Sequence, residues 1–258
     1  MALADRAPRG PRILTIDLER TPGTVELDVW EPRDFKRINY VHPDRWSELP
    51  ATLCYSWKWY GERGTQFAST WDGDDLAAIS WDLFNEADAV VTYNGKRADE
   101  KWLKSDWVMA GYGPPSPWKS VDLFVTARRE FSFESKSLAH LCSRLGIENK
   151  SGHYSIADAR AALDGDLKAQ SRMRRYNKRD VTVTEGLADR LGPWLREWPN
   201  VGVYTGQERC CWRCGSEDFK QDGFTATALT MYALMYCDCG AWTRLNHRKH
   251  SVSTRVAR

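Results

Sequence analysis

Arg12-Ile-Leu-Thr-Ile-Asp17-Leu-Glu19 is the stretch of this 258-residue sequence that decides its fold. Apolar and β-branched residues precede Asp17, which predicts a buried strand over residues 12–17. Since side chains alternate across a strand, Asp17 and Glu19 project from one face. Two neighbouring carboxylates repel each other, and burial increases this cost unless a cation lies between them. Oxygen ligands of this kind suit Mg²⁺ or Mn²⁺, whereas a frayed strand end with two solvated acids is the alternative.

A third acid, Asp99, follows a second predicted buried strand, residues 89–93. Asn94-Gly95 predicts a turn after that strand, and Asp99 then falls in the first turns of a helix predicted over residues 96–110. For an isolated acid at this position, attraction to the positive end of the helix dipole is a sufficient explanation.

The fourth acid, Asp180, ends the stretch Tyr176-Asn-Lys-Arg-Asp180 in a helix predicted over residues 166–191. Tyr176 and Asp180 are four residues apart and share one helical face. Met173 and Val183 continue that face, so the acid lies among apolar residues, which is unusual. A core tyrosine beside a partly exposed acid is the alternative.

The predicted elements occur in the order strand, hairpin, helix, strand, helix, strand, then further helices. This order predicts an α/β fold with a mixed sheet and an antiparallel hairpin on one side. Residues 22–50 contain four prolines and are expected to form an irregular excursion over the surface. Besides the elements named above, we expect strands at 51–60, 65–70 and 118–122, and helices at 74–86, 123–129 and 136–145.

The four acids, in this order along the chain, resemble the motifs of the DEDD superfamily of exonucleases. Asp17-Leu-Glu19 matches the first motif, Asn94 through Asp99 the second, and Tyr176 through Asp180 the third in its tyrosine form. The histidine form would need His in place of Arg175. The resemblance covers residues 12–190 and is greatest to proofreading-subunit-like (DnaQ-like) proteins of bacteriophages, whose pattern also fits Phe131-x-Phe133-x-Ser135-x-x-Leu138 and Leu145-Gly-Ile.

This resemblance implies a ribonuclease-H-like five-stranded mixed sheet flanked by helices, and 3′–5′ exonuclease activity. The four acids would hold two Mg²⁺ or Mn²⁺ ions roughly 4 Å apart. Tyr176 would orient the attacking water rather than act as the base, since its unperturbed pKa is about 10. The motif usually has an aromatic residue where this chain has Ala98, which reshapes the expected pocket for the terminal base. Substrate contacts are expected from Leu18 (through its main chain), Asn94, Lys178 and Arg179.

Five of the seven cysteines lie between residues 210 and 239. Cys211-x-x-Cys214 and Cys237-x-Cys239 form two closely spaced pairs, which fit a tetrahedral structural Zn²⁺ site in a zinc ribbon. Cys210 is an alternative to Cys211, and unpaired reduced thiols are the alternative to zinc. A redox site is disfavoured because the pairs lack a strand–helix context. The remaining two, Cys54 and Cys142, are expected to be buried core thiols.

The formal net charge of +2 means that nucleic-acid contacts must come from local patches. Residues 168–179 and the segment after Cys239 contain several Lys and Arg residues and no acid. Either phosphate binding or simple solvation explains these basic segments.

The sequence contains no signal-peptide pattern and no apolar run long enough for a membrane span, so we expect a cytoplasmic protein, in the bacterial host if the source is a phage.

We therefore expect a 3′–5′ exonuclease acting on single-stranded DNA or 3′ ends, in phage replication, proofreading or repair beside a separate DNA polymerase. An exoribonuclease of the same superfamily and a non-catalytic nucleic-acid-binding module are the alternatives. The expected organisation is a flexible leader (1–11), an exonuclease domain (12–192), a linker (193–209), a zinc-ribbon module (210–246) and a basic tail (247–258).

Overall fold

The central strand of the larger sheet is β1 (Ile13–Arg20), which carries the first two acids. It pairs antiparallel with β4 on one side and parallel with β6 on the other, giving the strand order β5-β4-β1-β6-β7. The computed structural model describes residues 9–31, 33, 36, 38–147 and 155–254. The predicted mixed five-stranded sheet with its antiparallel hairpin is confirmed. Its other strands are β4 (Thr52–Trp59), β5 (Gln66–Ser69), β6 (Ala89–Thr92) and β7 (Lys119–Asp122).

Helices cover both faces of this sheet because its strands bury side chains on both sides. Leu14 and Ile16 of β1 pack against Phe84 of α1 (Leu76–Glu86) and Trp107 of α2 (Asp99–Met109). On the opposite face, Ile13 and the strands β6 and β7 pack against the following helices. These are α3 (Leu123–Glu130), α4 (Leu138–Arg144) and α6 (Leu167–Leu191), while α5 (Ile156–Leu163) packs on α6.

The 25-residue helix α6 is held at its start by Asp166, whose side chain accepts hydrogen bonds from the main chain of Lys168 and Ala169. The preceding helix α5 was not expected from the sequence. Its Ser155 and Asp158 form a reciprocal capping box, which is the local signal that identifies its start.

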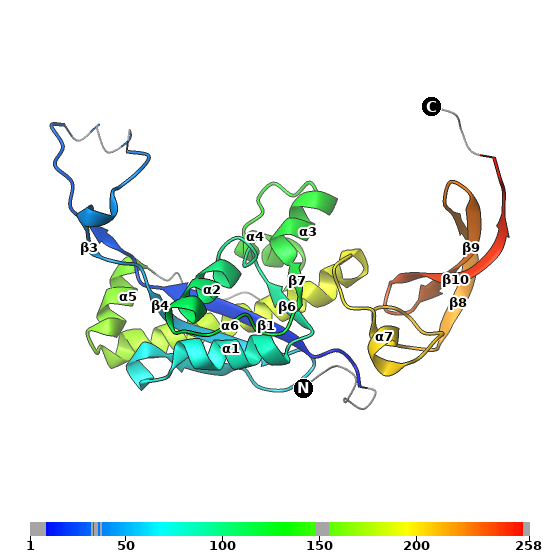
Figure 1. Ribbon diagram of the computed structural model, residues 1–258, viewed down its shortest axis with the longest axis horizontal. Coiled ribbons are helices and arrows are strands. Elements are labelled where there is room, and N and C mark those ends of the chain that lie inside the picture. Colours follow the sequence, from blue (N-terminus) through cyan, green and yellow to red (C-terminus); the bar gives the residue numbers. More distant parts are fainter. Residues whose placement is uncertain (1–8, 32, 34–35, 37, 148–154, 255–258) are drawn as a thin grey trace.

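Residues 22–50 are not wholly irregular as expected. They contain two short antiparallel strands, β2 (Thr24–Val25) and β3 (Trp46–Glu48), and a 3₁₀ turn over Pro43–Arg45. β3 lies at the end of the molecule opposite the C-terminal sheet (Figure 1).

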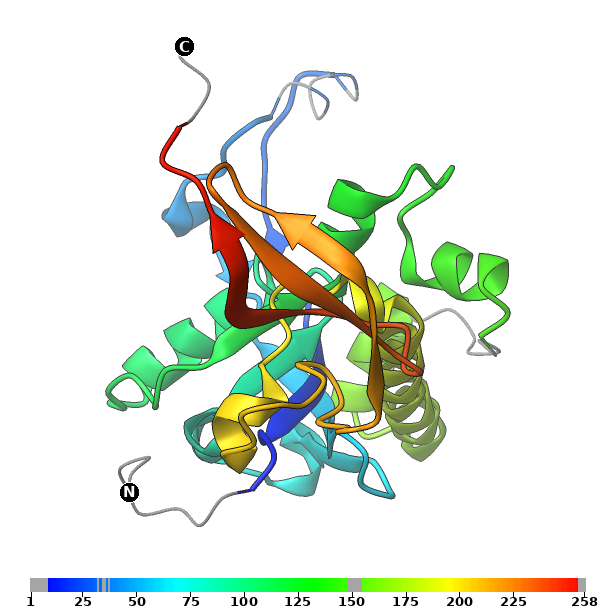
Figure 2. The same ribbon diagram turned by 90° about the vertical axis from the view of Figure 1, so that its right-hand side faces the viewer.

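The C-terminal sheet has the order β10-β9-β8 and is entirely antiparallel. Its strands are β8 (Phe219–Ala226), β9 (Thr230–Cys237) and β10 (Trp242–Ser251), and they lie in front of the body in Figure 2. β10 thus includes the first residues of the expected basic tail. Residues 1–8 of the expected leader and 255–258 of that tail lie outside the described residues.

The segment expected to be a linker packs against the body. It contains a 3₁₀ turn over Gly192–Trp194 and the short helix α7 (Val201–Thr205), and its Trp198 is buried in the core of the body. Arg213 of the C-terminal module lies over the Trp198 ring at 5.7 Å. A Cβ atom at Gly192 would lie 2.0 Å from this guanidinium, so a larger residue there would displace the Arg213 side chain.

In the described part of the chain, none of the helices combines the length and apolar character that crossing a membrane would require.

Candidate active site and metal centres

Carboxylates from distant parts of the sequence converge where β1 ends beneath α6. Side-chain oxygens of Asp17, Glu19 and Asp180 lie within 4.8 Å of one another. β1 supplies two of them because alternate residues share a face. The third comes from the buried stripe of α6, which runs through Met173, Asn177, Asp180, Thr184 and Leu187.

The electrostatics of this group oppose ionisation. Burial, together with the charges of Glu19, Asp99 and Asp180, raises the pKa of Asp17 well above its usual value. Burial, with Asp180 and Asp99, raises the pKa of Glu19 to about 8. Asp99 is not within the group of three but is close enough to act on both β1 acids. Divalent cations would remove this repulsion, so the donor set fits hard, oxygen-binding metal ions.

Asp99 is the first residue of α2, and the turn that precedes it is fixed by a residue that the sequence reasoning missed. Asp122, at the end of β7, accepts hydrogen bonds from the main-chain N–H of Asn94 (2.9 Å) and Lys96 (3.2 Å). It also caps α3 through the N–H groups of Phe124 and Val125. An acid between an apolar strand and a helix is a recognisable N-cap signal. The charge of Asp122 adds to burial in raising the pKa of Asp99 to about 7.

A second missed residue is Asn177, whose side chain is completely buried. Its amide nitrogen donates to the Asp17 carboxylate at 2.8 Å and to the Asp17 carbonyl oxygen at 3.1 Å. The hydrogen bond to the carboxylate opposes the rise in the pKa of Asp17. Asn177 therefore fixes the orientation of the Asp17 side chain from α6, the helix that also carries Asp180. Its position in the third motif, three residues before Asp180, is the signal that could have identified it.

Tyr176 lies beside Asp180 on α6. Burial, the charge of Asp180 and a hydrogen bond with it raise the pKa of the Tyr176 phenol above its ordinary value. The phenol is therefore neutral at physiological pH and can donate or accept a hydrogen bond, but it is not a base.

The four expected substrate contacts occupy different surroundings. The side chain of Leu18 is buried on the sheet face opposite the acids, so only its main chain is available near them. Asn94 adopts a left-handed backbone conformation with φ of 64° in the turn before α2. Lys178 and Arg179 are partly exposed on α6. Ala98 immediately precedes α2 and provides no capping side chain.

The four cysteines Cys211, Cys214, Cys237 and Cys239 converge in the C-terminal module, with sulfurs within 4.8 Å of one another. The Cys211 and Cys239 sulfurs are 3.6 Å apart, as are those of Cys214 and Cys237. Burial raises the pKa of Cys237 to about 12, so a cation is needed to hold this thiol as thiolate. Four sulfurs at these separations fit one structural Zn²⁺ ion in a small zinc-binding module.

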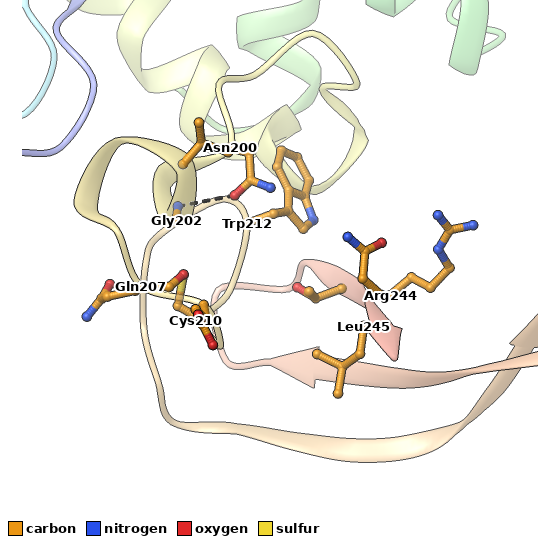
Figure 3. Close-up of a pocket in the computed structure, with 11 residues that line it drawn as sticks. Asn200, Gly202, Gln207, Cys210, Trp212, Arg244 and Leu245 are labelled. Atoms are coloured by element: carbon orange, nitrogen blue, oxygen red, sulfur yellow. Dashed lines mark hydrogen bonds between the residues drawn. The ribbon is translucent and has the colours of Figure 1, made fainter. Parts of the chain in front are cut away.

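Cys210 is not part of this cluster. Its sulfur lies 3.7 Å from the main-chain oxygen of Gln207 and lines a pocket of about 320 Å³ between α7 and β10 (Figure 3). Of the two adjacent cysteines, Cys211 is therefore the one that belongs to the cluster.

Comparison with known protein families decides the assignment of the body. A family model described as RNase_H superfamily matches residues 53–192, which include Asp99, Tyr176 and Asp180. The chain belongs to the RNase H superfamily. The matched region begins in β4, so Asp17 and Glu19 lie outside it. Both acids lie on β1, which pairs directly with β4.

The fold of this RNase H superfamily protein also occurs in solved structures. The family B DNA polymerase from the hyperthermophilic archaeon Pyrobaculum calidifontis matches with a TM-score of 0.52 and 18% sequence identity. The match covers 86% of this chain and 32% of the polymerase chain, so this chain spans about a third of that protein's length. No curated protein matches the sequence. The superfamily and the fold support a nuclease function with a nucleic-acid substrate.

The hydrogen bonds of Asn177 predict a positioning role. We expect Asn177→Ala to weaken Mg²⁺ binding by about 10- to 100-fold, because outer groups that orient metal ligands contribute on this scale. Isothermal titration calorimetry measures this affinity. Gln170→Ala is the matched control, since Gln170 lies on the same helix and its side-chain amide donates to the Ala162 carbonyl oxygen. Equal Mg²⁺ affinity in wild type and Asn177→Ala would contradict the role.

The raised pKa values predict how stability depends on pH. Without bound cations, Glu19 keeps its proton up to about pH 8 in the folded protein, whereas in the unfolded chain the same carboxyl loses its proton near pH 4.5. The folded state therefore binds more protons in this range, and the free energy of unfolding should fall as pH rises from 4.5 to about 8. Saturating Mg²⁺ should make this decrease in the free energy of unfolding smaller. Urea unfolding at several pH values tests this, and an identical pH dependence with and without Mg²⁺ would argue against cation binding.

The sulfur geometry predicts which cysteines hold zinc. We expect Cys239→Ser to lose the zinc and Cys210→Ser, its matched control, to retain one ion per chain. Inductively coupled plasma mass spectrometry of the purified variants measures the content. Equal loss from both variants would mean that Cys210 takes part in the site.

Proposed function

We propose that this protein is a metal-dependent 3′–5′ exonuclease that removes nucleotides from the 3′ ends of single-stranded DNA. The observation that carries the proposal is the convergence of Asp17, Glu19 and Asp180 within 4.8 Å, with Asp99 close enough to raise the pKa of two of them. Isolated acids on unrelated elements have no structural reason to be buried together. Their order along the chain is that of the DEDD motifs.

The four acids would hold the divalent metal ions. When bound, such ions lower the pKa of water and neutralise the charge that develops on a phosphate and its leaving oxygen. Asn177 holds the Asp17 carboxylate in place through its 2.8 Å hydrogen bond. Asp122 fixes the turn that precedes Asp99.

Tyr176 is proposed to orient the attacking water through its neutral hydroxyl. Its neighbour Asp180 supports this role because the phenol and the carboxylate are hydrogen-bonded to each other. We propose that the terminal nucleotides contact the main chain of β1 at Leu18 and Glu19. They are also proposed to contact the side chains of Asn94, Lys178 and Arg179, which are all partly exposed.

The direction of digestion is proposed from the motif resemblance, and the fold shared with a DNA polymerase supports DNA as the substrate. Participation in phage DNA replication, proofreading or repair, beside a separate polymerase, follows from the same resemblance. Zinc in the four-cysteine cluster is proposed to be structural, since four protein ligands leave no open position.

The decisive variant is Asp17→Asn, which keeps the size of the side chain and removes its charge. We expect Mg²⁺-dependent release of mononucleotides from a 5′-labelled single strand to fall on the order of 10³-fold, as when a group that stabilises developing charge is lost. Asp82→Asn is the control, because Asp82 is an exposed acid on α1. Gel analysis of the labelled products measures rate and direction together.

Wild-type activity should shorten the labelled strand stepwise from its 3′ end and leave circular single-stranded DNA intact. Cleavage of the circle, or unchanged activity in Asp17→Asn, would overturn the proposal. A parallel RNA substrate tests the exoribonuclease alternative.

A further inference from the structure

The strand pairing of the C-terminal sheet determines which of its residues share a face. Met235 and Cys237 of β9 are buried beside Cys211 and Phe219, so their side of the sheet is the inner face. Tyr232 and Tyr236 alternate with them along β9 and project from the other side, which we call the outer face. Leu234 lies between the two tyrosines at the same two-residue spacing and shares the outer face. Residues paired with these three also share it: Lys220 and Trp242 lie opposite Tyr236, Arg244 lies opposite Leu234, and Arg248 lies opposite Tyr232.

Two of the three aromatic rings on the outer face are exposed, and the third, Tyr232, is half-buried. Trp242 is 47% exposed and Tyr236 is 41% exposed, with their ring centroids 5.0 Å apart. Tyr and Trp are enriched at binding surfaces, and neighbouring exposed rings form a contiguous apolar patch rather than scattered single residues. In contrast, the aromatic Phe219 on the inner face is buried against the cysteine cluster.

Positive charge surrounds these rings. The Arg244 guanidinium lies 4.6 Å from the centroid of Tyr232. Lys220, Arg244 and Arg248 are exposed, and within the described residues none of them forms an ion pair with an acid. Between residues 219 and 251 the four Lys and Arg residues outnumber Asp222 and Asp238, the two acids. The surface therefore complements a polyanion that also presents flat apolar groups.

We propose that the outer face is a stacking platform for single-stranded DNA, on which bases lie against Tyr232, Tyr236 and Trp242 while phosphates contact Lys220, Arg244 and Arg248. Aromatic rings interleaved with cations are the recurrent means of binding single strands without sequence preference. A duplex hides its base faces, so this surface selects unpaired strands. The proposal rests on the proposed function for the choice of DNA, and it adds a binding surface outside the four-acid site.

The dimensions of the platform indicate how many nucleotides it holds. Tyr232 and Tyr236 are four residues apart on one strand, which corresponds to about 13 Å. A stacked single strand advances about 3.4 Å per nucleotide, so the rings span about four nucleotides. Trp242 lies at the level of Tyr236 on the neighbouring strand and widens the platform there. In Figure 2 the three strands run together along the front of the molecule.

The test measures binding separately from catalysis. All variants are made in the full chain carrying Asp180→Asn, so that a fluorescent single strand is not degraded, and binding is followed by fluorescence anisotropy without a chelator. We expect Trp242→Ala to weaken binding by about 5- to 150-fold, the range for loss of one base–aromatic stack. The matched control is Phe224→Ala, because Phe224 is 43% exposed but lies opposite Ala233, on the inner side of the same sheet.

The charges are tested by salt dependence. Arg248→Gln should make the slope of log affinity against log salt concentration shallower by about 0.7, the value for one phosphate contact on a single strand. This exposed substitution also keeps the proposal testable if Trp242→Ala loses its zinc or its fold. A duplex of the same sequence should bind less tightly and be insensitive to Trp242→Ala.

Three results would overturn the platform: unchanged binding in Trp242→Ala, an equal loss in Phe224→Ala, or equal affinity for the duplex. At least tenfold tighter binding of the matching RNA would overturn DNA as its ligand. Failure of the proposed function is recognised separately, as absence of Mg²⁺-dependent turnover by the chain with its native Asp180.

Discussion

Repulsion between carboxylates that the fold buries together is the constraint on which this structure depends. β1 is the middle strand of the sheet, so its end lies deep in the body, and α6 crosses it there with another acid on its buried stripe. Hydrophobic burial on both faces of the sheet stabilises this arrangement against the repulsion. A cation bound at this site would therefore also stabilise the folded chain.

Neutral hydrogen-bond donors and helix caps keep the acids in place. Asn177 reaches from α6 to Asp17, and Asp122 reaches from β7 to the turn before Asp99. Each residue ties one strand or helix of the site to another, and both are buried. Side chains held in this way require little rearrangement when a ligand binds, which is the condition for an efficient catalytic site.

The two candidate metal centres offer opposite ligand chemistries, carboxylate oxygens in one and cysteine sulfurs in the other. Oxygen ligands bind hard cations that can still exchange water and substrate, whereas four sulfurs enclose zinc completely. The C-terminal module has only a small buried cluster around Cys211, Phe219 and Met235, so metal would supply much of its folding energy. In the proposed function the acidic site repels a polyanion until cations bind, and the basic, aromatic sheet of the module provides attraction elsewhere on the same strand.

The sequence by itself determined the five strands of the main sheet, most of the helices around it, the four acids as candidates and the spacing of the cysteine pairs. These follow from local patterns: alternation along β1, the four-residue interval between Tyr176 and Asp180, and short cysteine spacings. Only the tertiary structure decided that Asn177 bonds to Asp17, 160 residues away, and that Asp122 fixes the turn at Asn94. It also decided that Cys211 and not Cys210 joins the cluster, and that the basic segment after Cys239 is a strand sharing a face with aromatic rings. The physical reason is that these contacts depend on strand register and helix packing between distant segments, which no local pattern specifies.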